Sequence, residues 1–583
     1  MNKIRNLNIW SATSMFLLGM VCAAGAAGTI YVDADAPGPT HDGSTWANGY
    51  RYLQDALAVA VSGDEIWVAK GIYKPDQGAR VTAGDRYATF QLKNGVALYG
   101  GFAGSETSID ERRWQTNENI LSGDIGTLGS TGDNSYHVVT GSGTDGTALL
   151  DGFTITAGKA NSLNPYNSGA GMYNDNGNPA VVNCTFSGNW AGYFGAGMFN
   201  DNSSPGLTNC IFSGNTVAGG GGGGMQNYGG SPTLTNCTFS GNWAGWGGGM
   251  YNEDCSPGLT NCTFSGNWAA YGGGMENDCS SPTLTNCTFS GNSANNGGGI
   301  INAVSSGPSL TNCAFSGNSS SYSGGGMSNV YFSSPTLTNC TFSGNSAPHG
   351  NALACDSYEK WLPSTLEVAN SILWDGGDEI WNNDGSTIAI TYSDVRGGWT
   401  GEGNISADPM FVGAGDYHLQ DGSPCIDAGT NSAPALPDTD KDGNLRIVGA
   451  AVDMGAYEWQ GPSVITVAID IKPGSYPNAI NLGSYGLIPV AILSDQQFDA
   501  TTVDAETVEL AGAGVAVRGR ANKYMAHSED VNGDGLLDLV VQVGTENLDA
   551  GSLQDGYAIL TGKTYGGVPI EGKDEIIIVP PEK

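Results

Sequence analysis

A repeated segment constrains the fold of this chain more than any other feature. Seven near copies lie between residues 180 and 345, and each contains a cysteine directly after an asparagine. Successive cysteines are 25 to 27 residues apart: Cys184, Cys210, Cys237, Cys262, Cys287, Cys313 and Cys340. A period in the mid-twenties indicates a solenoid, in which each copy forms one coil that stacks on the next.

The repeat has the composition of short β-strands. The copy "LTNCTF" is rich in β-branched and aromatic residues, follows a proline and precedes a Gly-Asn pair. We expect Asn236 to form a corner, because asparagine tolerates the left-handed backbone region. Leu234, Cys237 and Phe239 would then point inward. The glycines 247–249 turn the chain into a strand that starts at Met250.

A second asparagine recurs two residues after each glycine-rich end: Asn174, Asn200, Asn227, Asn252, Asn277, Asn302 and Asn329. Coils of a parallel solenoid stack about 4.8 Å apart, so equivalent amides can hydrogen-bond from coil to coil. A charge repeated at an inward position would face its own copy at about 5 Å, which explains the neutral repeat. No Lys or Arg occurs between Lys159 and Lys360.

Two elements of each copy, "GGGM" or "GGGI" and "FSGN", resemble the repeats of bacterial polymorphic outer membrane proteins. The chain is similar more broadly to right-handed parallel β-helix proteins of the pectate-lyase-like group. The resemblance covers about residues 150–355, and it implies an all-β, right-handed parallel β-helix solenoid in a secreted bacterial protein. A capping helix at residues 51–61 would close the open end. Lyases of this group use an Arg or Lys base, which the regular coils lack.

Composition divides the chain into five parts. Residues 1–26 combine a basic start, a short apolar run and small residues, the pattern of a secretory signal peptide. We expect residues 29–150 to form the N-terminal cap and first coils, residues 151–355 the regular repeats, and residues 356–457 irregular C-terminal coils. Residues 464–583 contain about six turn-separated apolar runs, which predict a small C-terminal β-sandwich module.

The formal net charge is −35. Such a charge repels nucleic acids and anionic lipids, so we expect no nucleic-acid partner. No apolar run after residue 26 is long enough to cross a bilayer. We therefore expect a secreted protein, extracellular or at the cell surface, with no transmembrane segment after signal cleavage.

Two acidic loops have the spacing of calcium ligands. The candidate ligands are Asp530, Asn532, Asp534 and Asp538 in the C-terminal module, and Asp438, Asp440, Asp442 and Asn444 before it. Hard oxygen ligands at alternate positions of a short loop suit Ca²⁺. The first loop resembles those of dockerin or integrin-type repeats. Neither loop has the usual glutamate at position 12, and a metal-free acidic turn is the alternative. Bound Ca²⁺ would be structural.

The regularly spaced cysteines are predicted to be reduced, buried fillers. In-register parallel side chains hold their Cβ atoms near 4.8 Å, which is longer than a disulfide favours. Cys255 and Cys279 lie before the next strand in neighbouring copies. Since exported proteins can form disulfides, these two residues are a candidate pair at a turn.

Acidic and aromatic residues recur on the coils. The acidic set, which follows the recurring asparagines, is Asp175, Asp201, Glu253 and Asp278. Stacked acids about 5 Å apart would suit a glycosidase, and a solvated edge or weak cation-binding stripe is the alternative. The main aromatic residues are Trp190, Trp243, Trp246 and Trp268. Their rings would either stack on sugar faces or cover the coil turns.

Two functions fit this sequence. The first is a secreted, non-catalytic cell-surface or extracellular matrix protein, adhesin-like or glycan-binding, whose partners are extracellular polysaccharides or cell-surface components. The second is a carbohydrate-active enzyme, a glycosidase or polysaccharide lyase, on the same scaffold. We favour the first, because repeat identity spreads chemistry evenly and no single coil stands out. No residue is assigned a catalytic role, and fold alone does not imply lyase activity.

Overall fold

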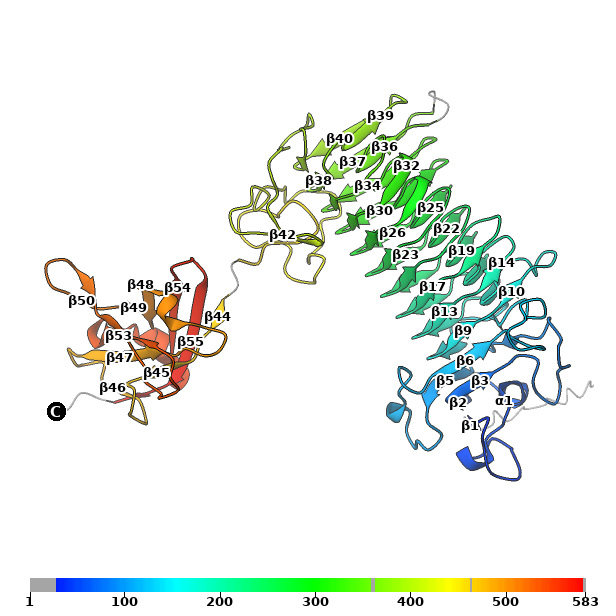
Figure 1. The fold of residues 1–583 in the computed structure, drawn as a ribbon, viewed down its shortest axis with the longest axis horizontal. Helices are drawn as coiled ribbons and strands as arrows, with labels where there is room; N and C mark the ends of the chain where they lie inside the picture. The colour runs from blue at the N-terminus through cyan, green and yellow to red at the C-terminus, as the bar shows by residue number, and fades with distance from the viewer. Residues whose placement is uncertain (1–27, 358–361, 462–463, 580–583) are drawn as a thin grey trace, which may run out of the picture. The chain divides into compact units, whose positions relative to one another are not determined.

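The structure is a computed structural model that describes residues 28–357, 362–461 and 464–579. The predicted signal peptide lies outside these residues. The chain forms two compact units, divided after Glu458. The first unit is a right-handed parallel β-helix, and its coils appear in Figure 1 as a stack of short arrows from blue to yellow-green.

Each regular coil contributes one strand to each of three parallel sheets, named sheet A, sheet B and sheet C. In the described residues, sheet A has 13 strands, sheet B has 12 and sheet C has 11. Equivalent residues of successive copies pair in register, for example Asn227 with Asn252 and Phe239 with Phe264. The solenoid predicted from the repeat period is confirmed.

Sheet A consists of β1 (Thr29–Val32), β2 (Glu65–Ala69), β5 (Ala97–Phe102), β8 (Leu149–Asp151), β12 (Ala180–Val182), β16 (Gly206–Thr208), β20 (Thr233–Thr235), β23 (Gly258–Thr260), β26 (Thr283–Thr285), β30 (Ser309–Thr311), β34 (Thr336–Thr338), β37 (Thr365–Ala369) and β40 (Thr387–Thr391). Sheet B consists of β3 (Gly71–Tyr73), β6 (Asn119–Ser122), β9 (Thr154–Thr156), β13 (Thr185–Ser187), β17 (Ile211–Ser213), β21 (Thr238–Ser240), β24 (Thr263–Ser265), β27 (Thr288–Ser290), β31 (Ala314–Ser316), β35 (Thr341–Ser343), β38 (Ile372–Trp374) and β41 (Asp394–Val395).

Sheet C consists of β4 (Phe90–Gln91), β7 (Val139–Thr140), β11 (Met172–Asp175), β15 (Met198–Asp201), β19 (Met225–Tyr228), β22 (Met250–Glu253), β25 (Met275–Asp278), β29 (Ile300–Ala303), β33 (Met327–Asn329), β36 (Leu353–Cys355) and β39 (Ile380–Asn382). Short extra strands lie in the segments between sheet B and sheet C and pair with one another: β10 (Lys159–Ala160), β14 (Trp190–Ala191), β18 (Thr216–Val217), β28 (Ser293–Asn296) and β32 (Ser319–Ser323). A small hairpin follows the last coil: β42 (Phe411–Gly413) and β43 (Asp416–Leu419).

The corner between sheets A and B is a single asparagine in every regular coil. Its backbone φ lies between 51° and 57° at Asn183, Asn209, Asn236, Asn261, Asn286, Asn312, Asn339 and Asn370. This left-handed conformation resets the alternation of the strand. Leu234, Cys237 and Phe239 are therefore all buried, as predicted.

Two ladders of buried amides run along the solenoid. In the ladder predicted from Asn174 to Asn329, each side-chain Nδ2 donates to the Oδ1 of the next asparagine at 2.8 to 2.9 Å. A second ladder joins the "FSGN" asparagines, from Asn189 to Asn345. Stacked phenylalanine rings lie beside it, with centroids 4.4 to 4.9 Å apart from Phe186 to Phe342.

The N-terminal end of the solenoid is closed by α1 (Leu53–Val59), the one α-helix among the described residues. It begins after Tyr52 and buries Leu53, Ala56 and Leu57, and it packs against β1, β2 and β4. This helix lies within the predicted range of residues 51–61. It keeps water from the apolar interior of the first coil.

Residues 430–458, the return segment, fold back over the asparagine corner of the last coils. Asn312 Nδ2 donates to the Thr439 carbonyl oxygen at 2.9 Å, and Lys441 Nζ donates to the Asn286 carbonyl oxygen at 2.7 Å. Asn370 Nδ2 donates to the Thr430 carbonyl oxygen at 3.0 Å. The sequence does not predict this return. It brings two cations, Lys441 and Arg446, against coils that have none of their own.

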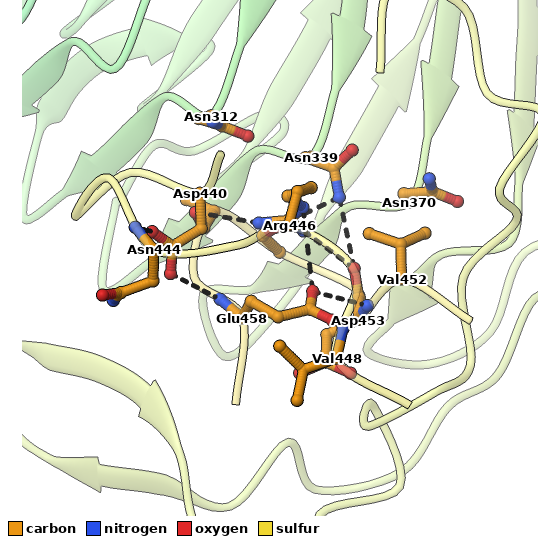
Figure 2. A network of polar contacts seen from close by, with 12 residues as sticks. Asn312, Asn339, Asn370, Asp440, Asn444, Arg446, Val448, Val452, Asp453 and Glu458 are labelled. Carbon is orange, nitrogen blue, oxygen red and sulfur yellow. Dashed lines mark hydrogen bonds and ion pairs between the residues drawn. The ribbon is translucent and has the colours of Figure 1, made fainter. Parts of the chain in front are cut away.

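Arg446 holds the return segment together. Its side chain is fully buried, and its guanidinium donates to the carbonyl oxygens of Asp453, Gly455 and Ala456 at 2.7 to 3.1 Å. The Glu458 carboxylate lies 3.8 Å from Arg446 Nε. Figure 2 shows Arg446 between Asp440 and Asp453, with Asn339 of the solenoid nearby. Burial raises the pKa of Glu458 to about 7.

The second unit is the predicted β-sandwich. One sheet contains β44 (Ile465–Thr466), β55 (Pro569–Glu575), β54 (Tyr557–Thr564), β48 (Val503–Leu510) and β49 (Ala513–Gly514). The other contains β45 (Ile469–Ile471), β47 (Leu487–Ile492), β53 (Asp538–Gly544) and β52 (Ala526–Glu529). Both sheets bury their apolar faces in one cluster that includes Val490, Val508, Val541 and Leu560. Two small pairs accompany them: β46 (Ala479–Ile480) with β56 (Ile577–Ile578), and β50 (Val517–Arg518) with β51 (Lys523–Tyr524).

The amide ladder makes a direct prediction. Asn252→Ala leaves the Nδ2 group of Asn227 and the Oδ1 atom of Asn277 buried without their partners. The free energy of unfolding should fall by about 2 kcal/mol. Chemical denaturation followed by tryptophan fluorescence measures the change.

Thr283→Ala, on the exposed face of β26, is the matched control and should change stability little. Equal stability of Asn252→Ala and Thr283→Ala would contradict a stabilising role for the ladder.

Candidate functional site

The outward face of sheet C carries the candidate site. In strands such as β22 and β25, the first and third residues point inward as Met and Asn, and the second and fourth point outward. The segments before β22, β25 and β29 form one wall, where Trp246, Tyr271 and Asn296 are register partners. Val304 and Tyr331, in the turns that follow the strands, face them across the sheet. The surface between the two walls is the sheet C groove.

Two hollows lie in the sheet C groove. The larger has a volume of about 680 Å³, and its lining includes Trp246, Tyr271, Glu276, Asp278 and Tyr322. The smaller, of about 370 Å³, is lined by residues that include Tyr193, Phe199, Asp201, Tyr228 and Glu253. Since Glu253 and Asp278 are register partners on β22 and β25, the two hollows occupy adjacent strands of one face.

The predicted acidic residues stand in one row. Asp175 pairs in register with Asp201, Tyr228 interrupts the row, and Glu253 pairs with Asp278. Burial raises the pKa of Asp201, and the neighbouring Asp175 adds to the rise. Burial also raises the pKa of Glu253, with the charges of Asp278 and Asp254 adding to it, and that of Asp278. Burial is thus the main reason that ionisation of Asp201, Glu253 and Asp278 is costly, and a neighbouring carboxylate adds to the cost at each of the three.

Glu276 is a carboxyl that the sequence analysis missed. It lies two residues before Asp278 on β25, is only 8% exposed, and its Oε2 atom has no hydrogen-bond partner. Burial raises the pKa of Glu276 well above its usual value, and the charge of Asp278 raises it further. The equivalent residues of neighbouring coils are Tyr251 and Ile301. A single glutamate at a position that is uncharged in the other regular coils is the signal that could have identified it.

The predicted aromatic row divides in the structure. Trp246 lies in the wall of the groove with Tyr271. Trp243 and Trp268 lie outside both hollows and stack on each other, with centroids 5.2 Å apart and each 39% exposed. Trp190 is covered by Lys159, whose Nζ is 4.2 Å from the ring centroid. One ring of the four therefore faces the groove.

The return segment places the second predicted calcium loop in a hydrogen-bonded turn. Asp440 is fully buried, and its carboxylate accepts the backbone N–H groups of Asp442, Asn444 and Glu458 (Figure 2). Asp442 Oδ2 lies 2.6 Å from His418 Nε2. Asp438 contributes its carbonyl oxygen, which accepts the Arg446 N–H.

The first predicted calcium loop is also closed by its own hydrogen bonds. Asp530 accepts the N–H groups of Gly533 and Gly535. Asn532 Oδ1 accepts the Asp534 N–H, and buried Asp538 accepts those of Ser494 and Val531. Within residues 28–357, 362–461 and 464–579, no group of three or more His, Cys, Asp or Glu is placed to hold a metal ion. Calcium binding at either loop stays a prediction.

The predicted pair Cys255 and Cys279 is not bonded; both residues are free thiols. Cys255 is buried, and its N–H donates to Ser280 Oγ, which places it opposite Ser280 in the next coil. Cys279 is exposed and takes the left-handed backbone conformation of Asp254 in the coil before it. The two cysteines are therefore one residue out of register. The seven ladder cysteines are buried free thiols, as expected from their spacing.

None of the helices in the described part of the chain is long and apolar enough to cross a membrane.

Comparison with known proteins agrees with the fold. The family described as "Right handed beta helix region" matches residues 116–270 and 225–395. No curated protein matches the chain.

Three solved structures are similar at low identity. Pectate lyase Pel9A is 13% identical, covering 74% of this chain and 96% of its own, with a TM-score of 0.40. A rhamnogalacturonan lyase is 13% identical, covering 72% and 95%, with a TM-score of 0.29. Tailspike protein 2 of Escherichia coli O157:H7 bacteriophage CAB120 is 11% identical, covering 90% and 65%, with a TM-score of 0.33.

The buried carboxyl of Glu276 makes stability depend on pH. The pKa of Glu276 is raised in the folded state above its usual value of 4.5, so the folded protein holds this proton at pH values where the unfolded chain has lost it. The stability of the folded state therefore falls as the pH rises above 4.5. Glu276→Gln removes this penalty. Its Tm should exceed that of the wild type by about 2–4 °C at pH 8, with no difference near pH 4.

Thermal unfolding at several pH values measures the effect. Asp254→Asn, an exposed change beside the groove that suits the left-handed backbone, is the control and should give no such gain. If the Tm of Glu276→Gln and that of the wild type changed in parallel with pH, the ionisation of Glu276 would not be costly in the folded state, and the prediction would be wrong.

Proposed function

We propose that this chain is a secreted, non-catalytic glycan-binding protein of the cell surface or extracellular matrix, and that its sheet C groove holds an uncharged saccharide chain. The observation that carries the proposal is the lining of the groove, where the aromatic side chains of Trp246 and Tyr271 lie beside the carboxyls of sheet C. Secretion rests on the sequence of residues 1–26, and calcium at the Asp530–Asp538 loop is a structural part of the same proposal.

The lining of the groove suits sugars. Trp246, Tyr271 and Tyr322 offer flat apolar rings to the C–H faces of pyranose units. The carboxyls of Asp201, Glu253 and Asp278 are available to accept hydrogen bonds from hydroxyl groups. A largely apolar surface with a few placed polar groups is the usual composition of a ligand site.

The charge of the groove selects against acidic glycans. Among the described residues that line its two hollows there is no Lys or Arg. A uronate chain would meet carboxylates without a compensating cation, in a protein with a net charge of −35. An uncharged polysaccharide meets no such penalty, and this supports a neutral ligand.

Glu276 supports a second candidate function, that of a glycosidase. Glu276 and Asp278 are two residues apart on one face of β25, a spacing of about 6.6 Å along a strand, and glycosidase carboxyls are about 5–9.5 Å apart. A carboxyl with a raised pKa beside one that ionises more readily is the arrangement of a general acid and its partner.

Retention on neutral polysaccharides tests glycan binding. The purified full-length protein should be retarded in gels that contain an uncharged polysaccharide. Tyr271→Ala or Trp246→Ala should weaken the apparent affinity about 10-fold through loss of ring stacking. Trp243→Ala removes an exposed ring outside the groove and should retain the wild-type affinity. Equal retention of all three variants, or none by the wild type, would refute the proposal.

An assay for new reducing ends, with the same polysaccharides as substrates, distinguishes a glycan-binding protein from a glycosidase. Binding without turnover is expected from the favoured function. Cleavage that falls at least about 100-fold in Glu276→Gln, with retention preserved, would instead establish the enzyme. Cleavage that persists unchanged in Glu276→Gln would exclude this pair of carboxyls from the reaction.

A further inference from the structure

A third hollow lies on a different face of the solenoid, where residues 112–118 cross the corner between sheets A and B. This segment is firmly attached. The Arg113 N–H and Asn117 Nδ2 donate to the Gly101 carbonyl oxygen at 2.6 and 3.2 Å. Arg112 Nη2 lies 2.5 Å from Asp151 Oδ2, and both side chains are largely buried. Trp114 is thereby held over the corner.

The coil beneath Trp114 has a glycine where the regular coils have a corner asparagine. Register places Gly152 of the preceding coil at the position of the corner asparagine Asn183. A Cβ atom on Gly152 would lie 3.1 Å from Trp114 Cβ and 3.5 Å from Arg112 Nη1. Glycine keeps the left-handed corner, at φ 85°, while it leaves space for the tryptophan.

The hollow, here named the Trp114 site, has a volume of about 670 Å³. Trp114, Thr116 and Glu118 line one side, and the outward residues Thr154, Thr185 and Ile211 line the other, beside the corner amides Asn183 and Asn209. Ile211 is 43% exposed, although its register partners on both sides, Thr185 and Thr238, are threonines. An exposed isoleucine thus replaces a hydroxyl within the same hollow.

The polar groups of the site retain hydrogen-bonding capacity. Asn183 Nδ2 donates to Asp151, and Asn183 Oδ1 accepts from Asn209 Nδ2, each using one of the two bonds that the group can make. Thr154 Oγ1 lies 3.2 Å from Glu118 Oε1. Donors and acceptors therefore surround an indole ring and an isoleucine, and this combination matches the alternating hydroxyl and C–H surfaces of a sugar.

Charge narrows the ligand class. Glu118 is the charged residue among those described as lining the site, and the nearby Arg112 is committed to Asp151. An anion would be repelled, and one carboxylate is too few for a metal ion. We propose that the Trp114 site binds a short uncharged oligosaccharide, independently of the sheet C groove, so that the solenoid has two separate contacts with glycans.

Titration of the full-length protein with neutral oligosaccharides of three to five units tests this proposal. The probes are cello-, xylo-, manno- and malto-oligosaccharides, with an oligogalacturonide as the acidic control, and calorimetry measures affinity and the number of sites. W114A should lose one site, with at least a 10-fold fall in its affinity. Y271A and the control W243A should leave that site unchanged, and the oligogalacturonide should not bind it.

A second variant guards against local disruption. I211T restores the repeat residue at an outward position, so the fold should be kept, and affinity at this site should fall about fourfold through lost apolar contact. Unchanged affinity in both W114A and I211T, or no binding by any neutral probe, overturns the proposal. Loss of binding in Y271A alone would support the groove and refute a site at Trp114.

Discussion

Hydrogen bonds between identical side chains of successive coils hold this protein in register. In the ladder from Asn174 to Asn329, each buried amide donates to the next one along the axis. A buried amide without such a partner would cost about 1–3 kcal/mol, so each coil is stable only with its neighbour in place. The Phe186–Phe342 stack follows the same rule with apolar rings. Inward positions therefore tolerate little variation.

The departures from the repeat that build the two candidate sites lie at outward and corner positions. Glu276 replaces an aromatic or aliphatic residue on sheet C, and Ile211 replaces a threonine on sheet B. Gly152 replaces a corner asparagine and admits Trp114 from a neighbouring loop. Each departure changes the chemistry of the surface without interrupting the internal ladders. Single substitutions on individual coils can thus create specific surface sites while the internal scaffold stays regular.

The stacking also governs the electrostatics. Equivalent outward carboxyls such as Glu253 and Asp278 lie one strand apart, and together with burial this raises the pKa of Glu253. Glu253 is therefore harder to ionise than an exposed carboxyl, which favours contact with uncharged hydroxyl groups. Lys441 and Arg446 reach the last regular coils from the return segment and have a structural role there.

The sequence by itself determined the parallel β-helix, the asparagine corners, the inward Leu, Cys and Phe, and the capping helix near residues 51–61. It could do so because one coil repeats, and a local pattern copied at a fixed period can form contacts only with its own copies. The acidic row and Trp246 followed from the same period.

Only the tertiary structure decided which residues from different elements meet. The return of residues 430–458 over the corner and the position of Trp114 above Gly152 depend on contacts made by segments outside the repeat. Such contacts have no period, and their geometry is set by packing in three dimensions rather than by local sequence.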